Sequence, residues 1–410
     1  MSNNKDKNFI NETVARKKKN FRELLGKGAF FCVEALAFGV IAAVAFAWME
    51  PRVKKLIGDT SEPVITIYHD STTEEQVEND NEGTTSDNNG QQSNNESEEN
   101  GLDRILDSVV MVESRTNILD DNDEKIGEDF KYSSGAVIST GTDTVILTDY
   151  DTVKDCDIIK VTFDNESQCV GYVKNVDKQL GLAVISADTM DVFDKEYLPA
   201  KNVFGNSTYI SNGDELLYVG VSEGVGKINH NCEVITVDNL VQYTDCMYSM
   251  FTTDMASNVA RNGFVYDEKG NLVGMIANPE NNGIANLVAA LGATDIKPVV
   301  EKLSNGNSLP YMGINGTTVT AKLKENVNKG MPDGVYVTSV ETNSPAYSVG
   351  ILNGDIITDV AGRKISSFKT FSNTINNLST GNSVEVNVSR YGKNGYKKIK
   401  FNVIIGGKEN

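Results

Sequence analysis

The stretch GVYVTSVETNSPAYSVGILNGDIITDVAGRKI, residues 334–365, decides the fold of the last hundred residues of this chain. Pro345 and Gly350 bracket one short helix, because proline favours the first helical turn and glycine the position just after the last one. Gly354 then sets a turn, and the apolar residues after it predict a strand. The stretch therefore predicts a short helix, a turn and a strand in quick succession.

Two segments flank this stretch and complete a recognisable domain. Before it lies Tyr311-Met312-Gly313-Ile314. After it a helix is predicted over 367–378, where apolar residues recur at helical spacing at Phe368, Phe371, Ile375 and Leu378. The three segments together resemble a PDZ domain, whose core pattern G-x-x-V-x-x-V-x-x-x-S-P-A-x-x-A-G-L-x-x-G-D-I-I residues 334–365 follow closely. We assign residues 308–405 to this domain.

The PDZ resemblance implies a peptide-binding site. Its expected residues are Tyr311, Met312, Gly313 and Ile314, whose backbone N–H groups would face the terminal carboxylate of a peptide. A β-carbon at Gly313 would crowd that ligand and penalise a positive φ. The peptide would add as a strand beside the segment after Ile314. Phe371 and Ile375 either line the groove beside this strand or belong to the core of the domain.

The segment before the PDZ domain, residues 101–303, is rich in short strands. Turn residues separate β-rich runs about every 8 to 15 residues, as expected for antiparallel barrels. Clear helical patterns are confined to 102–109 and 294–303. We therefore predict an all-β fold with a small α+β appendage.

This segment resembles the HtrA (DegP-like) family of trypsin-fold serine proteases. Six stretches follow the family pattern in the same order: SSGAVIS at 133–139, VILTDYDTV at 145–153, VDKQLGLAVISAD at 176–188, FGNSTYISNGDELLYVGVSEG at 204–224, TDMASNVARNGFVYDEKGNLVGMIA at 253–277 and ATDIKPVVEKLSNGNSLPYMGI at 293–314. The resemblance implies a double β-barrel over 101–303, joined to the PDZ domain. It also implies trimers, so we keep a homo-oligomer as an expectation.

The catalytic positions depart from the family pattern. Asp151 stands where the family has its general-base histidine, and Gly181 where it has the aspartate that orients this histidine. VARNGF at 259–264 replaces the family's G-N-S-G-G-P, which puts Arg261 at the serine position, or Ala260 if the alignment shifts by one. A serine hydroxyl attacks a carbonyl only when a neighbouring base takes its proton. The sequence therefore predicts that all three catalytic residues are lost.

Other residues offer little to replace the lost triad. His230 is the only histidine in residues 101–303, but its place in KINHNCEV is far from the position of the aligned base. Ser257 is near the position of the lost nucleophile in the sequence, and we interpret it as an ordinary serine in a turn. Asp151 has no D-T-G frame that would make it half of an aspartic dyad. Of the glycine-rich turn that builds the family's oxyanion hole, only Gly263 remains.

The first hundred residues predict a membrane anchor and a tether. Residues 1–28 carry eight basic side chains, and 29–49 are apolar except for Glu34, a length that matches one membrane-spanning helix. The basic excess places the N-terminus in the cytoplasm and residues 101–405 outside it. A cleaved signal peptide is the competing interpretation. Residues 59–100 hold twelve acidic and no basic side chains, which predicts a disordered acidic linker.

Composition excludes several classes of function. A net charge of −19 disfavours nucleic acid as a partner. Two histidines and five cysteines without a C-x-x-C pair leave no metal site, and no cofactor is expected. Cys156, Cys169, Cys232 and Cys246 would lie outside the cytoplasm. Cys232 and Cys246 are equidistant from Asn239, so a disulfide across a hairpin tip there is one possible pairing.

Two functions follow as hypotheses. The first is a membrane-anchored, extracytoplasmic pseudoprotease that binds exposed or C-terminal peptide segments of envelope proteins through its PDZ domain and does not hydrolyse them. The second is an active HtrA-type endopeptidase that uses a rearranged site.

Overall fold

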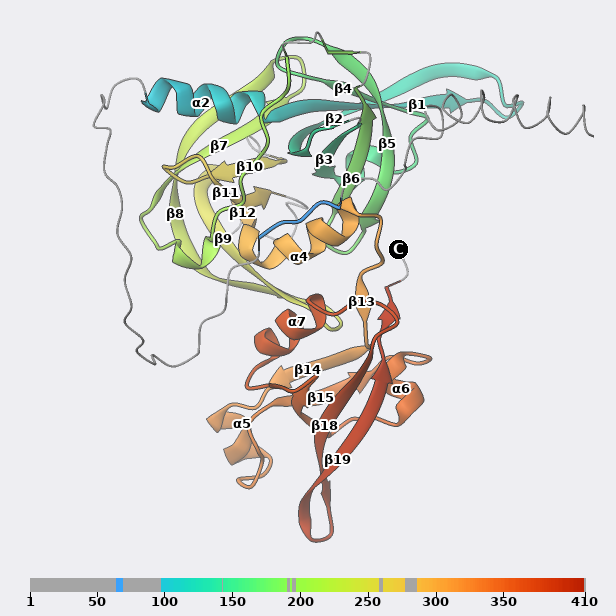
Figure 1. Cartoon of the computed structure of the whole chain (residues 1–410), viewed down its shortest axis with the longest axis vertical. Helices are drawn as coiled ribbons and strands as arrows, with labels where there is room; N and C mark the ends of the chain where they lie inside the picture. The colour runs from blue at the N-terminus through green and yellow to red at the C-terminus, as the bar shows by residue number, and fades with distance from the viewer. Residues whose placement is uncertain are drawn as a thin grey trace, which may run out of the picture. The chain divides into compact units, whose positions relative to one another are not determined.

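The structure is a computed structural model that describes residues 64–68, 97–141, 143–189, 192–193, 197–257, 261–276 and 286–408 (Figure 1). The predicted cytoplasmic tail, the predicted membrane helix and most of the predicted linker lie outside these residues. Within the described part of the chain, none of the helices has the length and apolar character needed to cross a membrane. From Ile65 onward the chain forms one unit, which contains two barrels and the PDZ domain.

The first barrel closes from six antiparallel strands in the order β1-β2-β3-β6-β5-β4. The strands are β1 (Val109–Leu119), β2 (Lys125–Ser139), β3 (Asp143–Asp149), β4 (Ile158–Thr162), β5 (Gln168–Asp177) and β6 (Leu182–Asp188). Helix α2 (Ser97–Asp107) precedes them, and the single turn of α3 (Tyr150–Val153) follows β3. Val110, Val137, Ile146 and Ile185 are fully buried inside this barrel, because β-branched side chains alternate inward along the strands.

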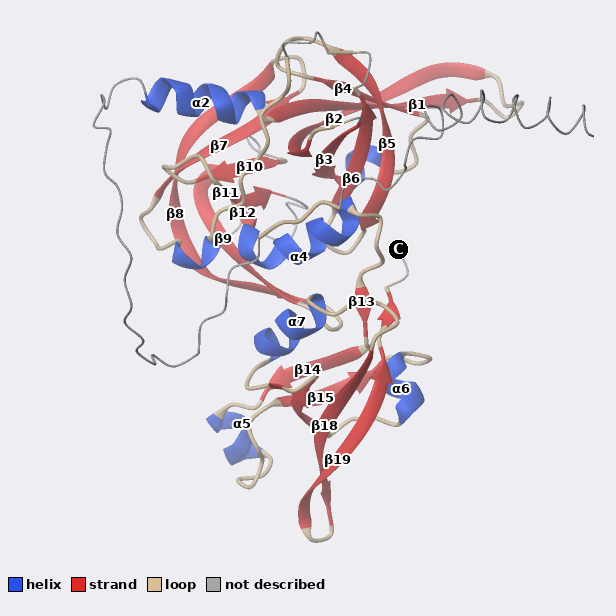
Figure 2. Cartoon of the chain, viewed as in Figure 1, coloured by secondary structure: helices blue, strands red, loops and turns tan. Residues whose placement is uncertain are grey.

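The second barrel has the same size and closes in the order β10-β11-β12-β9-β8-β7. Its strands are β7 (Glu215–Ser222), β8 (Gly226–Gln242), β9 (Met247–Ala256), β10 (Gly263–Tyr266), β11 (Leu272–Ile276) and β12 (Leu287–Gly292), with the short helix η1 (Ser207–Tyr209) before them. Helix α4 (Ala293–Ser304) leaves this barrel toward the PDZ domain (Figure 1). Strands dominate both barrels (Figure 2), so the predicted all-β fold is confirmed.

The PDZ domain is a five-stranded path β14-β15-β16-β18-β19, with β17 paired to β16. Its elements are β13 (Pro310–Tyr311), β14 (Ile314–Thr318), α5 (Ala321–Asn326), β15 (Val335–Val340), α6 (Pro345–Val349), β16 (Ile356–Val360), β17 (Arg363–Lys364), α7 (Phe368–Asn376), β18 (Ser383–Gly392), β19 (Gly395–Ile404) and β20 (Gly406–Gly407). The predicted short helix is α6, which starts at Pro345 and ends before Gly350 in the left-handed conformation.

The aspartate of the G-D-I-I segment holds the PDZ strands together. Asp355 is buried, and its carboxylate accepts hydrogen bonds from Arg390 Nε at 2.7 Å and Nη2 at 2.8 Å. It also accepts the backbone N–H of Leu352 at 2.9 Å, which closes the turn at Gly354. A bidentate pair of this kind fixes direction as well as charge. The motif therefore anchors the turn to β18.

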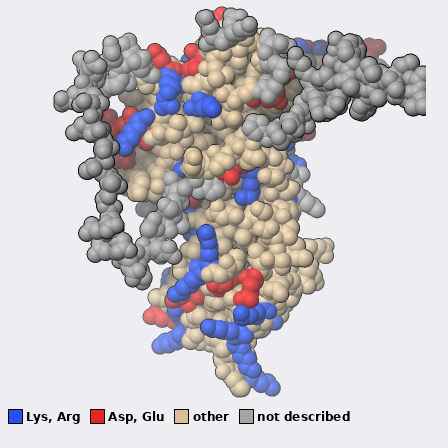
Figure 3. All heavy atoms as spheres, viewed as in Figure 1, with Lys and Arg blue, Asp and Glu red and all other residues tan. Residues whose placement is uncertain are grey.

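Charge is unevenly distributed over the molecule. Lys and Arg side chains gather at the end of the PDZ domain in Figure 3, where the β18–β19 hairpin carries the exposed residues Lys393, Lys397 and Lys398. The negative net charge of the chain is thus not shared by this end of the PDZ domain.

The hairpin of β8 and β9 corrects the prediction made for the cysteines. β8 continues to Gln242, which pairs with Met247, so the hairpin turns at residues 243–246 and not at Asn239. Two β-bulges in β8 shift the register, a feature that equal spacing in sequence cannot reveal. Cys232 instead pairs with Leu216 of β7. Cys156, Cys169, Cys232 and Cys246 are all free, so the possible Cys232–Cys246 pairing is not formed.

Candidate functional site

Two of the predicted catalytic positions meet at the end of β3. Asp151 lies in α3, where its exposed side chain pairs with Lys154. Tyr150 donates its backbone N–H to the carbonyl of Gly181 at 2.9 Å, so the two positions are neighbours. Asp149 caps α3 by accepting the N–H of Thr152 at 2.9 Å. Burial raises the pKa of Asp149, although the hydrogen bonds from Thr152 oppose this.

The third position, Arg261, precedes β10 in a turn that contacts the first barrel. Arg261 is exposed. The side-chain oxygen of the next residue, Asn262, accepts both the backbone N–H and the hydroxyl of Ser134, each at 2.9 Å. The carbonyl of Ser134 in turn accepts the hydroxyl of Thr148 at 2.9 Å, one residue before the cap of α3. These contacts connect the Arg261 turn to the strand that leads to Asp151.

Tyr218 packs under this turn. Its buried phenol donates a hydrogen bond to the carbonyl of Asn262 at 2.8 Å, and burial raises the pKa of Tyr218 well above its usual value. A β-carbon at Gly263 would lie 2.5 Å from the Tyr218 ring, and Gly263 has a φ of +144°. Gly263 is therefore required by the packing of Tyr218 as well as by its backbone.

The remaining sequence candidates lie in β8 and just after β9. His230 pairs with Tyr218 across β7 and β8 and is exposed, with its ring stacked parallel to the phenol at 6.4 Å between centroids. Ser257 donates its backbone N–H to the carbonyl of Asn286 at 3.0 Å, as an ordinary turn residue does. Ala260 lies outside the described residues.

The peptide-binding positions form a loop that holds a carboxylate. The backbone N–H groups of Met312 and Gly313 donate to one carboxylate oxygen of Asp245, each at 2.7 Å, and that of Ile314 donates to the other at 2.8 Å. Asp245 is 1% exposed. The loop thus has the donor geometry that the PDZ resemblance implies, but the carboxylate that it holds comes from the second barrel of the same chain.

The hairpin turn that carries Asp245, residues 243–246, lies along β14; we call it the docking turn. The backbone N–H of Asp245 donates to the carbonyl of Ile314 at 2.8 Å. Gln242, just before the turn, donates its side-chain amide to the carbonyl of Gly316 at 2.7 Å. On the other side, Met247 donates its backbone N–H to the hydroxyl of Ser372 in α7 at 2.8 Å. The docking turn therefore occupies the space between β14 and α7 where a peptide strand was predicted.

The other predicted PDZ residues take different roles. Phe371 and Ile375 are fully buried in the apolar core of the domain, against which Met247 packs. Tyr311 pairs with Gly406 in the small β13–β20 sheet. Gly313 has a φ of +90°, as predicted, but a β-carbon there would lie 2.2 Å from the Cβ of Ser344, so the group that it would crowd first is the cap of α6.

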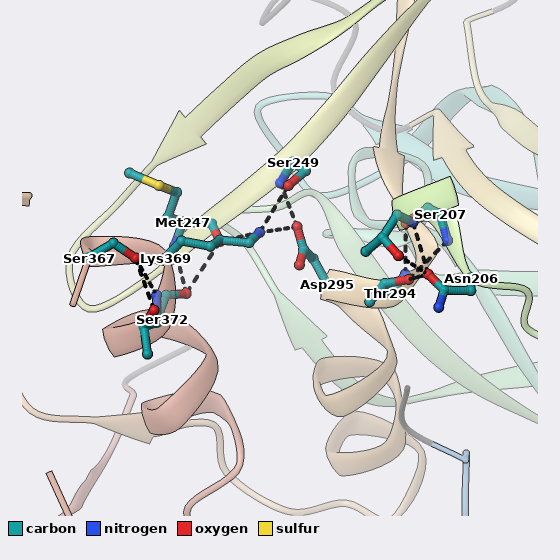
Figure 4. Close-up of polar contacts among 11 residues, drawn as sticks. Asn206, Ser207, Met247, Ser249, Thr294, Asp295, Ser367, Lys369 and Ser372 are labelled. Carbon is teal, nitrogen blue, oxygen red and sulfur yellow. Dashed lines mark hydrogen bonds and ion pairs between the residues drawn. The ribbon is translucent and has the colours of Figure 1, made fainter. Parts of the chain in front are cut away.

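A second set of polar contacts joins α7 to the second barrel (Figure 4). Lys369 pairs with the carboxylate of Asp295 in α4 and donates to the hydroxyl of Ser249 at 3.0 Å. Ser249 also donates its backbone N–H to Asp295. Burial lowers the pKa of Lys369, and its pairing with Asp295 opposes this. Nearby, Lys302 donates to the carbonyl of Asn376 at the end of α7 at 2.7 Å.

Comparison with known proteins shows which proteins the chain resembles. The PDZ domain family matches residues 310–404. The "Serine protease Do-like HtrA" of Lactobacillus helveticus is 21% identical over 301 residues, which span 69% of this chain and 71% of that protein. A "Serine protease HtrA-like" of Staphylococcus aureus is 27% identical over 282 residues, 62% of this chain and 35% of that protein. The chain is thus similar to HtrA-type serine proteases and carries a PDZ domain.

Solved structures of HtrA-type proteases share its fold. The "HtrA-type protease AlgW with decapeptide" aligns with a TM-score of 0.58 at 19% identity, and the alignment covers 77% of this chain and 99% of that one. The same protease with a tripeptide also aligns with a TM-score of 0.58, at 21% identity. At this level of identity the likeness concerns the fold, namely the double barrel followed by a PDZ domain.

Sequence patterns located the loop but gave no indication of Asp245. Asp245 and Met312 are 67 residues apart and belong to different domains. The only local signal is its place in the polar stretch YTDC between two strands, where an aspartate tolerates a positive φ; the observed φ is +63°. Burial raises the pKa of Asp245 to about 6, against the effect of its three backbone hydrogen bonds.

Proposed function

We propose that this HtrA-like protein is a membrane-anchored, extracytoplasmic pseudoprotease that binds exposed or C-terminal peptide segments through its PDZ domain. The observation that carries the proposal is the three-point grip of residues 312–314 on a carboxylate. Consecutive backbone N–H groups that hold a side-chain carboxylate have the chemistry to hold a peptide terminus. The peptides named in the titles of the AlgW structures support this class of ligand.

The absence of hydrolysis is supported by the residues at the catalytic positions. The chain has histidine only at positions 69 and 230. His230 stacks on Tyr218, and Asp151 pairs with Lys154. Without a base beside a hydroxyl, the acyl-transfer step loses the group that accepts the serine proton. Segments of envelope proteins are the proposed partners, and the proposed anchor is the apolar stretch 29–49.

Two measurements on the detergent-solubilised full chain test this function. The first is anisotropy titration with a labelled decapeptide that ends in a hydrophobic residue, either as the free acid or amidated. We expect only the free acid to bind. The second is incubation with an unfolded substrate and with a fluorophosphonate probe, for which we expect neither cleavage nor labelling. Labelling of the chain would instead favour the rearranged endopeptidase, the activity that the names of the curated relatives suggest.

The anchor has its own test in intact cells. With the N-terminus inside, added protease should degrade the PDZ domain without lysis, and an epitope placed before residue 28 should be protected. A PDZ domain that resists protease until the cells are lysed would contradict this topology.

A further inference from the structure

We infer that the docking turn is an internal ligand of the PDZ domain, so that a peptide carboxylate binds the loop only when Asp245 leaves it and the PDZ domain separates from the second barrel. This inference rests on the proposed peptide binding and names its regulation. It makes peptide binding and domain contact mutually exclusive.

The loop at residues 312–314 has no capacity for a second carboxylate. All three of its N–H groups, those of Met312, Gly313 and Ile314, donate to Asp245. A backbone amide has one proton to donate. A second carboxylate at this place would also face a like charge at contact distance in a dry site. A peptide terminus must therefore replace the side chain of Asp245.

The docking turn resembles a bound peptide in its other contacts with β14 as well as in its carboxylate. The N–H of Asp245 donates to the carbonyl of Ile314, as the last residue of an added strand would. Gln242 reaches the carbonyl of Gly316, two residues further along β14. Thr244 and Asn315 join their side chains at 3.1 Å between these two contacts. The β14 edge is thus already paired with chain from the second barrel.

The docking turn is a tight hairpin whose conformation presents the carboxylate of Asp245. Tyr243 and Cys246 exchange backbone hydrogen bonds at 2.8 and 3.3 Å, which close the hairpin over two central residues. The second of these, Asp245, takes the positive φ. Such a φ is tolerated by aspartate and disfavoured for most side chains. Asp245 is therefore both the residue with the positive φ and the residue whose carboxylate the loop holds.

The contacts around the docking turn are of a kind that allows the PDZ domain to separate from the second barrel. The contacts from the second barrel and α4 to α7 are largely polar: Lys369 with Asp295 and Ser249, Met247 with Ser372, and Lys302 with Asn376. Water replaces polar contacts of this kind at small net cost. Interfaces between domains of one chain are commonly of this type and permit relative motion. A peptide that takes the loop can therefore release the domain.

The test uses the full chain and the labelled decapeptide with a free carboxylate. Asp245→Asn keeps the shape of the side chain but replaces one acceptor oxygen by an N–H₂ group, which cannot accept the loop N–H bonds. The matched control is Asp254→Asn, which removes a charge from an exposed position of the neighbouring strand. We expect Asp245→Asn to bind the peptide at least about tenfold more tightly than wild type, because the competing state is removed, and Asp254→Asn to match wild type.

A second variant keeps the inference testable if Asp245→Asn fails to fold. Thr244→Cys with Asn315→Cys joins the docking turn to β14 at side chains that already touch. The oxidised form should not bind the peptide, and reduction should restore binding; each single variant controls for the native thiols. Equal affinity of wild type and Asp245→Asn, or binding by the oxidised double variant, overturns the inference alone. If neither wild type nor any variant binds the free acid, the proposed function fails and the inference fails with it.

Discussion

Gly313 donates its backbone N–H to the carboxylate of Asp245 at 2.7 Å, although 68 residues separate them. The contact joins the carboxylate loop of the PDZ domain to a hairpin tip of the second barrel. Because the donor is a backbone group, its direction depends on the conformation of residues 312–314 and not on any side chain. Changes at Gly313 therefore act on the fold of the loop before they act on a ligand.

Gly313→Ala should destabilise the PDZ domain. Its β-carbon would overlap the Cβ of Ser344, and the φ of +90° adds strain. Together these should lower the free energy of unfolding by roughly 2–4 kcal/mol. The control is Gly381→Ala, with a φ of +85° and no atom within 4 Å of the added carbon, which should lose only about 1 kcal/mol. Urea unfolding measures both, and equal losses would contradict the predicted clash.

Peptide affinity should fall as the pH is lowered. The pKa of Asp245 is about 6 in the docked state and starts from 3.8, so protons stabilise docking. A protonated carboxyl still offers lone pairs on both oxygens to the loop N–H groups, which the amide nitrogen in Asp245→Asn cannot do. That stabilisation is complete below about pH 4 and is lost as the pH rises through 6. When the pH is lowered from 7.5 to 5, the equilibrium constant for docking should therefore increase about tenfold. The apparent affinity of a competing peptide should fall by the same factor. Titrations at both pH values measure it.

The control for the pH effect is Asp245→Asn, which should show no such change. The other ionisable groups near Asp245 are Lys408, Cys246, Asp177 and Tyr248. Burial raises the pKa of the Cys246 thiol to about 12, and that of the Tyr248 phenol well above its usual value, so neither titrates in this window. A peptide carboxyl itself titrates below about pH 4. A pH effect that persists in Asp245→Asn would assign it to another group.

Lys369→Met should destabilise the full chain because it leaves Asp295 without its cation. The Asp295 side chain is only 8% exposed, and removal of one partner of a buried pair typically costs several kcal/mol. Because the Lys369 side chain is 29% exposed, the expected loss here is about 1–3 kcal/mol. Lys400→Met, which breaks the exposed pair with Glu385, should be much less destabilising, because water screens this pair. Urea unfolding compares the two. Adding Asp295→Asn to Lys369→Met should recover part of the loss.

Asn262→Ala should weaken the contact between the two barrels. It removes the acceptor for the N–H and the hydroxyl of Ser134, which is buried. A buried donor left without a partner costs about 1–3 kcal/mol. Asn262→Asp keeps the acceptor oxygen and should be less destabilising than Asn262→Ala. Thermal unfolding ranks the two variants, and the reverse order would show that the side-chain amide matters more than its oxygen.

Local patterns in the sequence were enough to predict several features. The short helix between Pro345 and Gly350 and the helix that holds Phe371 and Ile375 depend on residues only a few positions apart, so both appear in the sequence. The alternation of strands and turns likewise predicted the barrels. The loss of the catalytic residues stays a prediction, and it too rests on local motifs, such as VARNGF at 259–264.

By itself the sequence determined the classes of element, the double barrel with its PDZ domain, and the loop at 312–314 that grips a carboxylate. Only the tertiary structure decided which carboxylate that is. The β-bulges of β8 move the hairpin tip from Asn239 to residues 243–246, and a shift of register changes every contact beyond it. Asp245 meets the loop because α4 and the polar contacts of Lys369 hold the PDZ domain against this hairpin. Contacts between distant segments depend on such packing, which no local pattern encodes.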